Sequence, residues 1–444
     1  MSTSLPASVY QPKDSPQMSG NPFKVIVIGA GTGGLCLAQG LKADGIPVEV
    51  FEREHTPFDR QAGYRLSISP TGNRALKECL PESLFQKLVQ SSARPSRGVS
   101  FLDERLKPLL TIRLPEADAG SVDCERPIGR IALRRVLLQG LDEIVHFNKK
   151  FVAFKDAPDG RVTARFDDGT TATGDLLIGA DGANSRVRTQ LLPHAQRAET
   201  GIMAVSGKLG LNEQVRKLTP PEIFLGPTLM LGPKGCFLFA NAVEYGRTNA
   251  SVPHAGVLSN DDPLLGTDRE EYVMWGFSAR REKFGLYADR DAGEPEALKA
   301  AVLALMKDWH PALRWIVQNT TEISPFPVKT SVPIPAWQTR NVTLLGDALH
   351  NMTPFRGIGA NVALRDAAAL RRTLVRIVAG ESLLLESLAT YERQMIEYGF
   401  QAVRMSLKNM RQVHSEGLAR ELTKVTFRFM NLIPQLREKV QRNR

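Results

Sequence analysis

A glycine-rich turn between an apolar strand and a helical pattern constrains the fold of this chain more than any other feature. Residues 24–28 are rich in Val and Ile, the turn Gly29-Ala-Gly-Thr-Gly-Gly34 follows directly, and residues 35–42 continue at helical spacing. In the pattern G-x-G-x-x-G, the first glycine permits the tight turn, the second lets the backbone approach a pyrophosphate, and the third allows close packing of helix on strand. We therefore predict a dinucleotide site at Gly29, Gly31 and Gly34.

The next apolar strand supports this prediction. Residues 48–51 end at Glu52, about 20 residues beyond the turn, where a carboxylate can bind a pair of ribose hydroxyls. Arg53 follows, either as an adenine or ribose contact or as a solvated surface arginine. Because NAD and FAD present the same ADP half to such a turn, this unit alone does not distinguish the two cofactors.

Composition narrows the class of protein. The 444 residues are 42% hydrophobic and 23% charged, and the apolar runs are too short to cross a bilayer. The four cysteines lack the spacing of a metal site or a disulfide framework, so we expect reduced thiols and no bound metal. The net charge is +10, but the last 44 residues carry ten Lys and Arg against three Glu. The rest of the chain is nearly balanced, which argues against nucleic-acid binding.

The order of strand-like and helical patterns predicts an α/β fold with a discontinuous Rossmann-like domain, a β-rich domain and C-terminal helices. The discontinuous domain covers residues 23–200 and 329–380, with a hairpin near 97–114 that can join the β-rich domain, residues 201–328. Residues 381–444 form the C-terminal helical extension. Residues 1–22 are rich in Ser and Pro and lack the apolar core of a secretory signal, so we predict a flexible leader and an intracellular, cytoplasmic protein.

Three further motifs identify the cofactor. Residues 176–188 read LLIGADGANSRVR, residues 344–361 read LLGDALHNMTPFRGIGAN, and residues 130–133 read RIAL. These segments resemble the DG, GD and R-x-x-L signatures of the class A flavoprotein monooxygenases, the family of para-hydroxybenzoate hydroxylase. Together with the glycine turn they occur in the family's order, so the resemblance implies a Rossmann-like FAD domain with a β-rich substrate domain over the flavin.

The resemblance also implies which residues contact the cofactor. Arg130 is expected beside the flavin diphosphate or ribityl chain, Gly63 on a loop along the flavin, and Asp181 at a site that serves FAD and transient nicotinamide binding. In the GD segment the expected cofactor-binding residues are Asp347, Pro354, Gly357, Gly359, Ala360 and Asn361. The helix that follows is expected to point its N-terminus at the flavin edge that gains negative charge on reduction.

Arg356 departs from the common pattern of the flavin loop. A guanidinium at this position can hold an anionic or carbonyl-bearing substrate, steer the nicotinamide phosphate, or pair with a local acid, and Arg356 is the candidate catalytic residue. His350 is more typical of a structural hydrogen-bonding residue than of an acid–base catalyst. Aromatic residues alternate along residues 272–277, but the sequence does not show which face of this strand points inward.

The resemblance implies an oxidoreductase cycle. NAD(P)H reduces FAD, O2 forms a C4a-hydroperoxyflavin, and one oxygen atom passes to a small, electron-rich organic substrate by hydroxylation or epoxidation. The residues of the GD loop are similar to those of monooxygenases of secondary metabolism. The alternatives are a flavin-dependent reductase or dehydrogenase of the same superfamily and a catalytically silent flavin-binding protein. The substrate, the choice between NADH and NADPH, and the oligomeric state stay open.

The basic C-terminal segment mixes apolar residues with Lys and Arg. Leu418, Leu422, Val425 and Phe429 recur at helical spacing. We predict an amphipathic helix that packs its apolar side on the catalytic body, so that truncation before Gly417 exposes apolar surface. Peripheral contact with an anionic membrane is the second interpretation.

Overall fold

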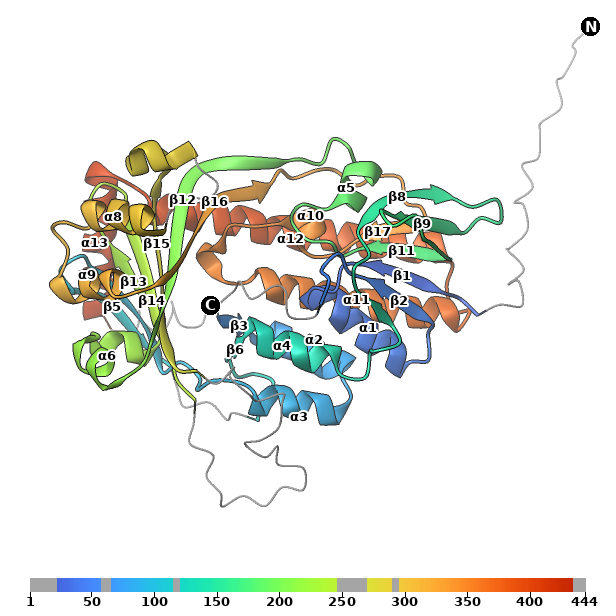
Figure 1. Cartoon of the computed structure of the whole chain (residues 1–444), viewed down its shortest axis with the longest axis horizontal. Helices are drawn as coiled ribbons and strands as arrows, with labels where there is room; N and C mark the ends of the chain where they lie inside the picture. Colours follow the sequence, from blue (N-terminus) through green and yellow to red (C-terminus); the bar gives the residue numbers. More distant parts are fainter. Residues whose placement is uncertain (1–21, 57–64, 115–119, 246–269, 290–294, 434–444) are drawn as a thin grey trace, which may run out of the picture.

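The computed structural model describes residues 22–56, 65–114, 120–245, 270–289 and 295–433 (Figure 1). These residues form two halves, one built on a parallel sheet and the other on a larger, mostly antiparallel sheet. Two C-terminal helices follow, and the predicted α/β fold class is confirmed.

The parallel sheet carries the glycine turn. Its strands lie in the order β17-β11-β1-β2-β7 and comprise β1 (Val25–Ile28), β2 (Val48–Phe51), β7 (Val145–His146), β11 (Leu176–Gly179) and β17 (Val342–Leu344). Every residue of β1 and β11 is buried, as expected for a parallel sheet that is covered on both faces. Because β17 pairs with β11, chain from beyond residue 340 completes a sheet begun at residue 25.

Several smaller elements surround this sheet. They are α1 (Thr32–Ala43), α2 (Pro70–Cys79), α3 (Glu82–Gln90), α4 (Arg130–Leu138), α5 (Arg186–Leu191), α10 (Asp347–His350), α11 (Gly359–Val378), the three-stranded sheet of β8 (Phe151–Asp156), β9 (Val162–Phe166) and β10 (Thr171–Gly174), and the pair β3 (Arg65–Ile68) and β6 (Arg126–Gly129). Helix α4 begins only at Arg130, because Ile128 pairs with Leu66 in the strand pair β3–β6.

The large sheet has seven strands in the order β16-β12-β15-β14-β13-β4-β5. They are β4 (Gly98–Asp103), β5 (Pro108–Arg113), β12 (Arg197–Gly210), β13 (Thr228–Leu231), β14 (Phe237–Val243), β15 (Tyr272–Arg280) and β16 (Glu322–Ser331), accompanied by α6 (Glu213–Leu218), α7 (Pro221–Leu225), the 3-10 segment η2 (Arg281–Asp289), α8 (Pro295–Leu305) and α9 (Pro311–Gln318). The β4–β5 hairpin joins the sheet through parallel pairing of β4 with β13. Trp275 and Phe277 lie in one core with residues of α8 and α9, so this face of β15 is structural.

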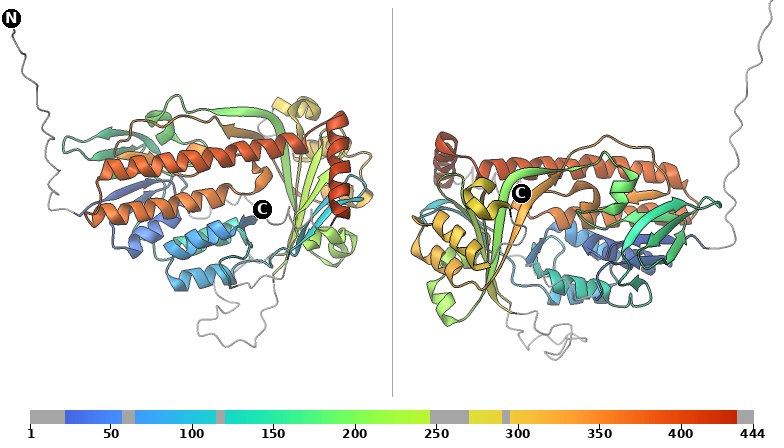
Figure 2. Two further views of the ribbon diagram at one scale, coloured as in Figure 1. Left: turned by 180° about the vertical axis from the view of Figure 1, so that it is seen from behind. Right: turned by 45° about the horizontal axis from the view of Figure 1, so that its top comes forward.

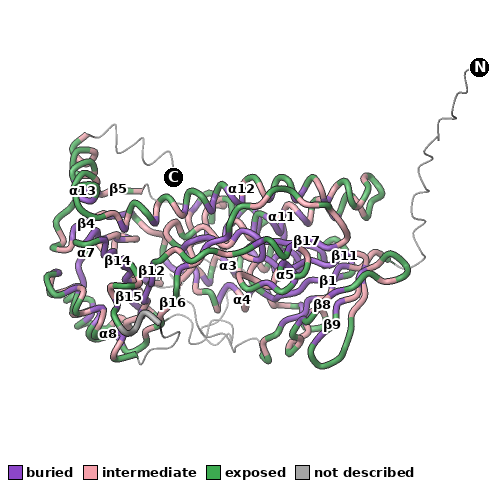
Figure 3. The backbone as a smooth tube through the Cα atoms, turned by 90° about the horizontal axis from the view of Figure 1, so that it is seen from above, coloured by how far each residue is buried: buried purple, intermediate pink, exposed green. Residues whose placement is uncertain are grey.

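Two C-terminal helices connect the halves. Helix α12 (Leu384–Val413) packs on α11 and reaches β16, and α13 (Gly417–Leu432) then crosses the edge strand β5 (Figure 2). In the view from above, α12 turns an exposed side to solvent over most of its length (Figure 3). Among the residues that the structure describes, no helix has both the length and the apolar character needed to cross a membrane.

The prediction for the last helix is wrong about which side docks. Leu418 is 90% exposed and Leu422 is 67% exposed, whereas Arg420 is 2% exposed and Lys424 is 7% exposed. The apolar side of α13 therefore faces solvent and its cationic side packs on the body. Contacts with the body explain this rotation. Asp103 at the end of β4 and Glu104 in the turn after it supply carboxylates, and Cys236 supplies a carbonyl oxygen, for the cations of α13.

Candidate active site

A cavity of about 1920 Å³ is lined by residues of both halves. At one end lie the glycine turn, the end of β2 and the loop after β11; at the other lies the face of the seven-stranded sheet opposite α8 and α9. A pocket for one small ligand typically measures roughly 300–1,000 Å³, so this cavity can hold a dinucleotide and a second molecule together.

The glycine turn combines tight packing with one open position. A side-chain carbon at Gly34 would lie 2.2 Å from the carbonyl oxygen of Gly29, so the helix and the turn approach too closely for any other residue. At Gly31, in contrast, such a carbon would meet no protein atom within 4 Å, and Gly31 lines the cavity. The turn therefore leaves space for a ligand at the start of α1, where unpaired backbone N–H groups favour a phosphate.

Glu52 is held at the edge of this space. Its carboxylate accepts hydrogen bonds from the backbone N–H of Ala30 at 2.8 Å and of Glu54 at 3.1 Å. Both Glu52 and the exposed Arg53 line the cavity. The two backbone bonds fix the carboxylate beside the turn, where it retains acceptor capacity for ribose hydroxyls.

Asp181 brings an unsatisfied carboxylate oxygen to the loop after β11. Its Oδ2 accepts the backbone N–H of Arg186 at 2.7 Å, whereas Oδ1 is buried and has no hydrogen-bond partner among the described residues. Burial raises the pKa of Asp181, although hydrogen bonds from Ser185 and the following backbone amides oppose this effect. A buried acceptor without a partner is costly, so Oδ1 is suited to a donor from a bound ligand.

The GD loop lines the cavity with backbone groups and with the carboxylate of Asp347. Asp347 is half-buried in the cavity wall, and within the described parts of the chain its carboxylate has no hydrogen-bond partner. The loop continues through Pro354, Arg356 and Gly357 to α11, whose first residues, Gly359, Ala360 and Asn361, line the cavity. No side chain caps the N-terminus of α11, so its first N–H groups can face a ligand.

The motif suggests that Asn361 contacts the cofactor, but its side chain bonds the protein backbone. Its side-chain oxygen accepts the N–H of Ser69 at 2.8 Å, and its amide donates to the carbonyl of Ser67 at 2.8 Å. The side chain thus joins α11 to the segment around β3, and only its position on the cavity wall remains for the cofactor.

His350 is buried in a network away from the cavity. It lies 2.7 Å from Asp366, whose other oxygen accepts the hydroxyl of Tyr398 at 2.6 Å. Burial alone would lower the pKa of His350, but the charge and hydrogen bond of Asp366 outweigh it and raise the pKa. The residue is 1% exposed and does not line the cavity, which fits the structural interpretation.

Strand register defines the substrate side of the cavity. In one row across the sheet, Ala204, Ser278, Phe237 and Leu231 lie side by side; in the next, Ser206, Gly276, Phe239, Leu229 and Phe101 do so. All of these residues line the cavity. This answers the open question about β15, because Gly276 and Ser278 face the cavity while Phe277 faces the core.

One polar pair interrupts this mostly apolar wall. The hydroxyl of Ser278 lies 2.9 Å from Nε2 of His414, and Nδ1 of His414 lies 2.8 Å from the carbonyl oxygen of Met410. Burial lowers the pKa of His414 to about 4, so the ring is neutral near pH 7. A carbonyl can only accept, so Nδ1 carries the proton, and Nε2 accepts the hydroxyl hydrogen of Ser278.

The pair adjoins the candidate catalytic loop. The ring of Phe355 packs edge-on against His414 at 5.0 Å, and Arg356 follows Phe355 on the cavity wall. Arg356 is half-buried and has no ion-pair or hydrogen-bond partner within the described segments. Its charge is therefore available to a ligand.

The structure brings nearly all of the predicted residues to one cavity. Its wall includes Gly29, Gly31, Glu52, Arg53, Arg130, Asp181, Asp347, Pro354, Arg356, Gly357, Gly359, Ala360 and Asn361. Gly34 packs behind the turn, and Gly63 lies outside the described residues. No group of His, Cys, Asp and Glu residues in the described segments is arranged to hold a metal ion.

Comparisons with known proteins identify the family of this chain. A family model described as an FAD binding domain matches residues 133–406, more than half of the chain. The FAD-dependent monooxygenase dbaB of Emericella nidulans is 31% identical over 371 residues, which cover 79% of this chain and 86% of that protein. The chain belongs to the FAD-dependent monooxygenase family.

A longer relative and a solved structure agree with this assignment. The dual O-methyltransferase/FAD-dependent monooxygenase elcB of Phaeosphaeria nodorum is 31% identical over 388 residues, which cover 82% of this chain and 41% of elcB. The chain thus spans less than half the length of the first curated relatives that it matches. The crystal structure of an FAD-containing monooxygenase from Photorhabdus luminescens superimposes with a TM-score of 0.78 at 30% identity, covering 88% of this chain and 98% of that chain.

Proposed function

We propose that this monooxygenase uses NAD(P)H and O2 to insert one oxygen atom into a small, electron-rich aromatic substrate, by hydroxylation or epoxidation. The observation that carries the proposal is the single cavity, which joins a dinucleotide cradle to an aromatic wall. The similarity of the GD loop to that of secondary-metabolite monooxygenases favours a role in secondary metabolism.

The residues present fit FAD. Gly31 leaves an open cradle at the start of α1, Asp181 offers a buried acceptor without a partner in the described chain, and Asp347 offers a carboxylate after the adjacent strand β17. In this arrangement Gly31 and Glu52 would hold the ADP half, while Asp347 and the start of α11 would hold the flavin half. When bound, the flavin supplies hydride acceptance from NAD(P)H and activation of O2.

The protein contributes position, charge and exclusion of water. The first N–H groups of α11 stabilise negative charge at the ligand edge that they face. Arg356 keeps its positive charge and so can orient a carbonyl or phenolate oxygen of the substrate but cannot accept a proton. The aromatic wall excludes water from the reacting atoms and offers flat surfaces for a planar substrate.

The wall also indicates what the substrate carries. Five of its side chains are phenylalanines, Phe101, Phe237, Phe239, Phe326 and Phe355, with Phe427 of α13 adding another. Ser278 donates its hydroxyl hydrogen to His414. Its oxygen therefore has only lone pairs left for a ligand in the cavity and can accept a hydrogen bond from it. A planar aromatic molecule with a free hydroxyl group matches both features.

The test is oxygen transfer by the FAD-loaded full chain. Planar phenols such as 2-naphthol and 1,3-dihydroxynaphthalene would be supplied with NADPH or NADH, and O2 uptake, NAD(P)H oxidation and product mass would be measured together. We expect substrate-stimulated O2 uptake and a product heavier by one oxygen atom. A reduced product without O2 uptake would instead indicate a reductase. FAD that NAD(P)H never bleaches, with any phenol present, would indicate a silent flavin-binding protein.

A further inference from the structure

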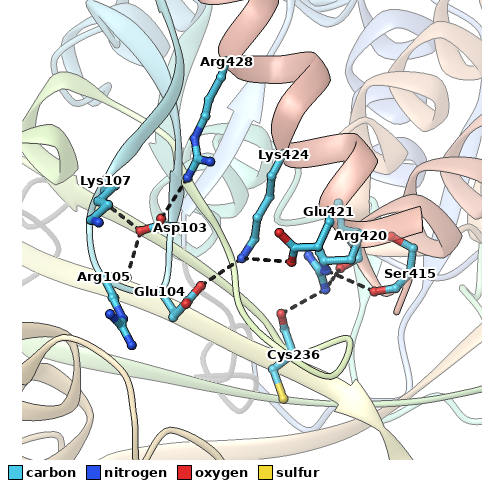
Figure 4. Close-up of polar contacts among 11 residues, drawn as sticks. Asp103, Glu104, Arg105, Lys107, Cys236, Ser415, Arg420, Glu421, Lys424 and Arg428 are labelled. Atoms are coloured by element: carbon cyan, nitrogen blue, oxygen red, sulfur yellow. Dashed lines mark hydrogen bonds and ion pairs between the residues drawn. The ribbon is translucent and has the colours of Figure 1, made fainter. Parts of the chain in front are cut away.

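Polar contacts set the rotation of helix α13 about its own axis, so that its cationic side faces the body. Arg420 donates to the carbonyl groups of Cys236, at 3.2 Å, and Val413, at 2.8 Å, and Lys424 pairs with Glu104 at 3.1 Å (Figure 4). Arg428 lies 3.3 Å from Asp103 on the same side. Each contact needs its own acceptor, so together they specify which side of the helix faces the body.

The rotation leaves a regular apolar stripe on the outside. Its members and exposures are Leu418, 90%, Leu422, 67%, Val425, 57%, Phe429, 57%, and Leu432, 78%. Contiguous apolar surface of this kind is rare on a monomer and marks a contact site. The views show α13 at the end of the molecule far from β1 and β2, where a partner can reach it (Figures 1 and 2).

The spacing of the stripe points to another helix. Its members follow one another by four, three, four and three residues, which is the a/d seam of a coiled coil. If Leu422 and Phe429 take position a, then Glu421 and Arg428 take position g. Their side chains flank the seam, with Glu421 66% exposed and Arg428 48% exposed.

We propose that α13 packs antiparallel against α13 of a second copy of this chain. In an antiparallel pair the g positions face each other. With Leu418 opposite Phe429 and Leu422 opposite Val425, Glu421 of each copy lies beside Arg428 of the other, and both pairs attract. A shift by one heptad would set Arg428 against Arg428, so charge selects the register.

The same features argue against a lipid surface as the occupant. Interfacial helices carry their Lys and Arg beside the apolar side, where these residues meet anionic headgroups. In α13, Arg420 and Lys424 point the opposite way, into the body. The border of the stripe carries one acidic residue, Glu421, and one basic residue, Arg428, which is half-exposed while it pairs with Asp103. This balance suits a self-complementary interface better than an anionic membrane.

The first test measures mass in solution on the FAD-loaded full chain, by sedimentation equilibrium over a dilution series. We expect a dimer, and Leu422→Glu should raise its dissociation constant by on the order of 100-fold or more, because two leucines leave the seam at once. Leu385→Glu is the matched control, since Leu385 is an exposed leucine on α12. A wild-type monomer at all concentrations, or a dimer indifferent to Leu422→Glu, would overturn the proposal.

A mixing experiment tests the register. Glu421→Arg and Arg428→Glu should each weaken self-association, because like charges then face each other. An equal mixture of the two variants should recover the wild-type association, since both facing pairs become opposite in charge. Damage within one copy, such as loss of the contact to Asp103, could not be repaired by mixing. Failure of the mixture to associate would overturn the antiparallel pairing. So would wild-type protein that stays monomeric yet sediments with phosphatidylserine vesicles through Leu422.

Discussion

The two walls of the cavity are specified in different ways. The wall on the parallel sheet consists of short motifs whose residues contact each other locally, as at Gly34, where an added side-chain carbon would lie only 2.2 Å from the carbonyl oxygen of Gly29. The wall on the seven-stranded sheet consists of rows that join strands far apart in the chain, as when Phe326, Ala204, Ser278 and Phe237 align. One wall is therefore fixed by local backbone geometry and the other by register, which only the folded sheet defines.

The difference has a functional consequence. A turn that must admit a pyrophosphate tolerates few residue types, because the backbone itself makes the contact. A sheet face tolerates many side chains of similar volume and so can change its ligand without changing the fold. Substitutions in the first wall should therefore affect FAD, and substitutions in the second should affect the substrate.

The largest effect is expected from Gly31→Val. The valine side chain would occupy the open space at the start of α1, so the variant should purify without FAD. Absorbance of flavin per chain measures this. Gly45→Asn is the control, because Gly45 also has open space and its φ of 70° suits asparagine. Stoichiometric FAD in Gly31→Val would remove the turn from the cofactor site.

Arg356 lies between the two walls, and its loss should separate binding of FAD from turnover. Arg356→Ala should keep FAD and lower substrate turnover by about 100-fold, the scale of losing one preorganised charge-stabilising donor. Because the substrate is then poorly held, more hydrogen peroxide should be released per NAD(P)H oxidised. Product and peroxide would be measured together, with Arg404→Ala on the exposed side of α12 as control. Wild-type turnover and coupling would show that Arg356 does not touch the substrate.

The same contrast explains which parts of the site could be predicted from the sequence. The glycine turn, the carboxylates Asp181 and Asp347 and the start of α11 carry local signatures, and the structure places all of them on one cavity. Ser278 and His414 are 136 residues apart and belong to no motif, so no local pattern announces their contact. The rotation of α13 was predicted wrongly because periodicity shows that a helix has two sides, while the partners Glu104 and Asp103 decide which side docks.

A moderate effect is expected at the first wall from Asp347→Ala. The side chain offers hydrogen bonds to the flavin half of the cofactor, and each such bond contributes about 1 kcal/mol net. The dissociation constant of FAD should rise by about tenfold, as measured by fluorescence titration of the apoprotein. Asp347→Asn should recover part of the affinity because its carbonyl oxygen still accepts. Unchanged affinity in Asp347→Ala would move this carboxylate out of the FAD site.

The smallest effect is expected at the second wall, from Ser278→Ala. His414 is neutral near pH 7 and takes the hydroxyl hydrogen of Ser278, so the serine oxygen can only accept from a substrate. Loss of one neutral hydrogen bond should raise KM for a phenol by about three- to tenfold while kcat and FAD content stay close to wild type.

The decisive comparison is 2-naphthol against 2-methoxynaphthalene, since the ether cannot donate a hydrogen bond. Wild type should bind the phenol more tightly, and Ser278→Ala should bind the two with similar affinity. His414→Phe would release the serine hydrogen and so should improve binding of the ether relative to the phenol. A preference for 2-naphthol that survives both substitutions would show that the aromatic wall, and not this polar pair, selects the substrate.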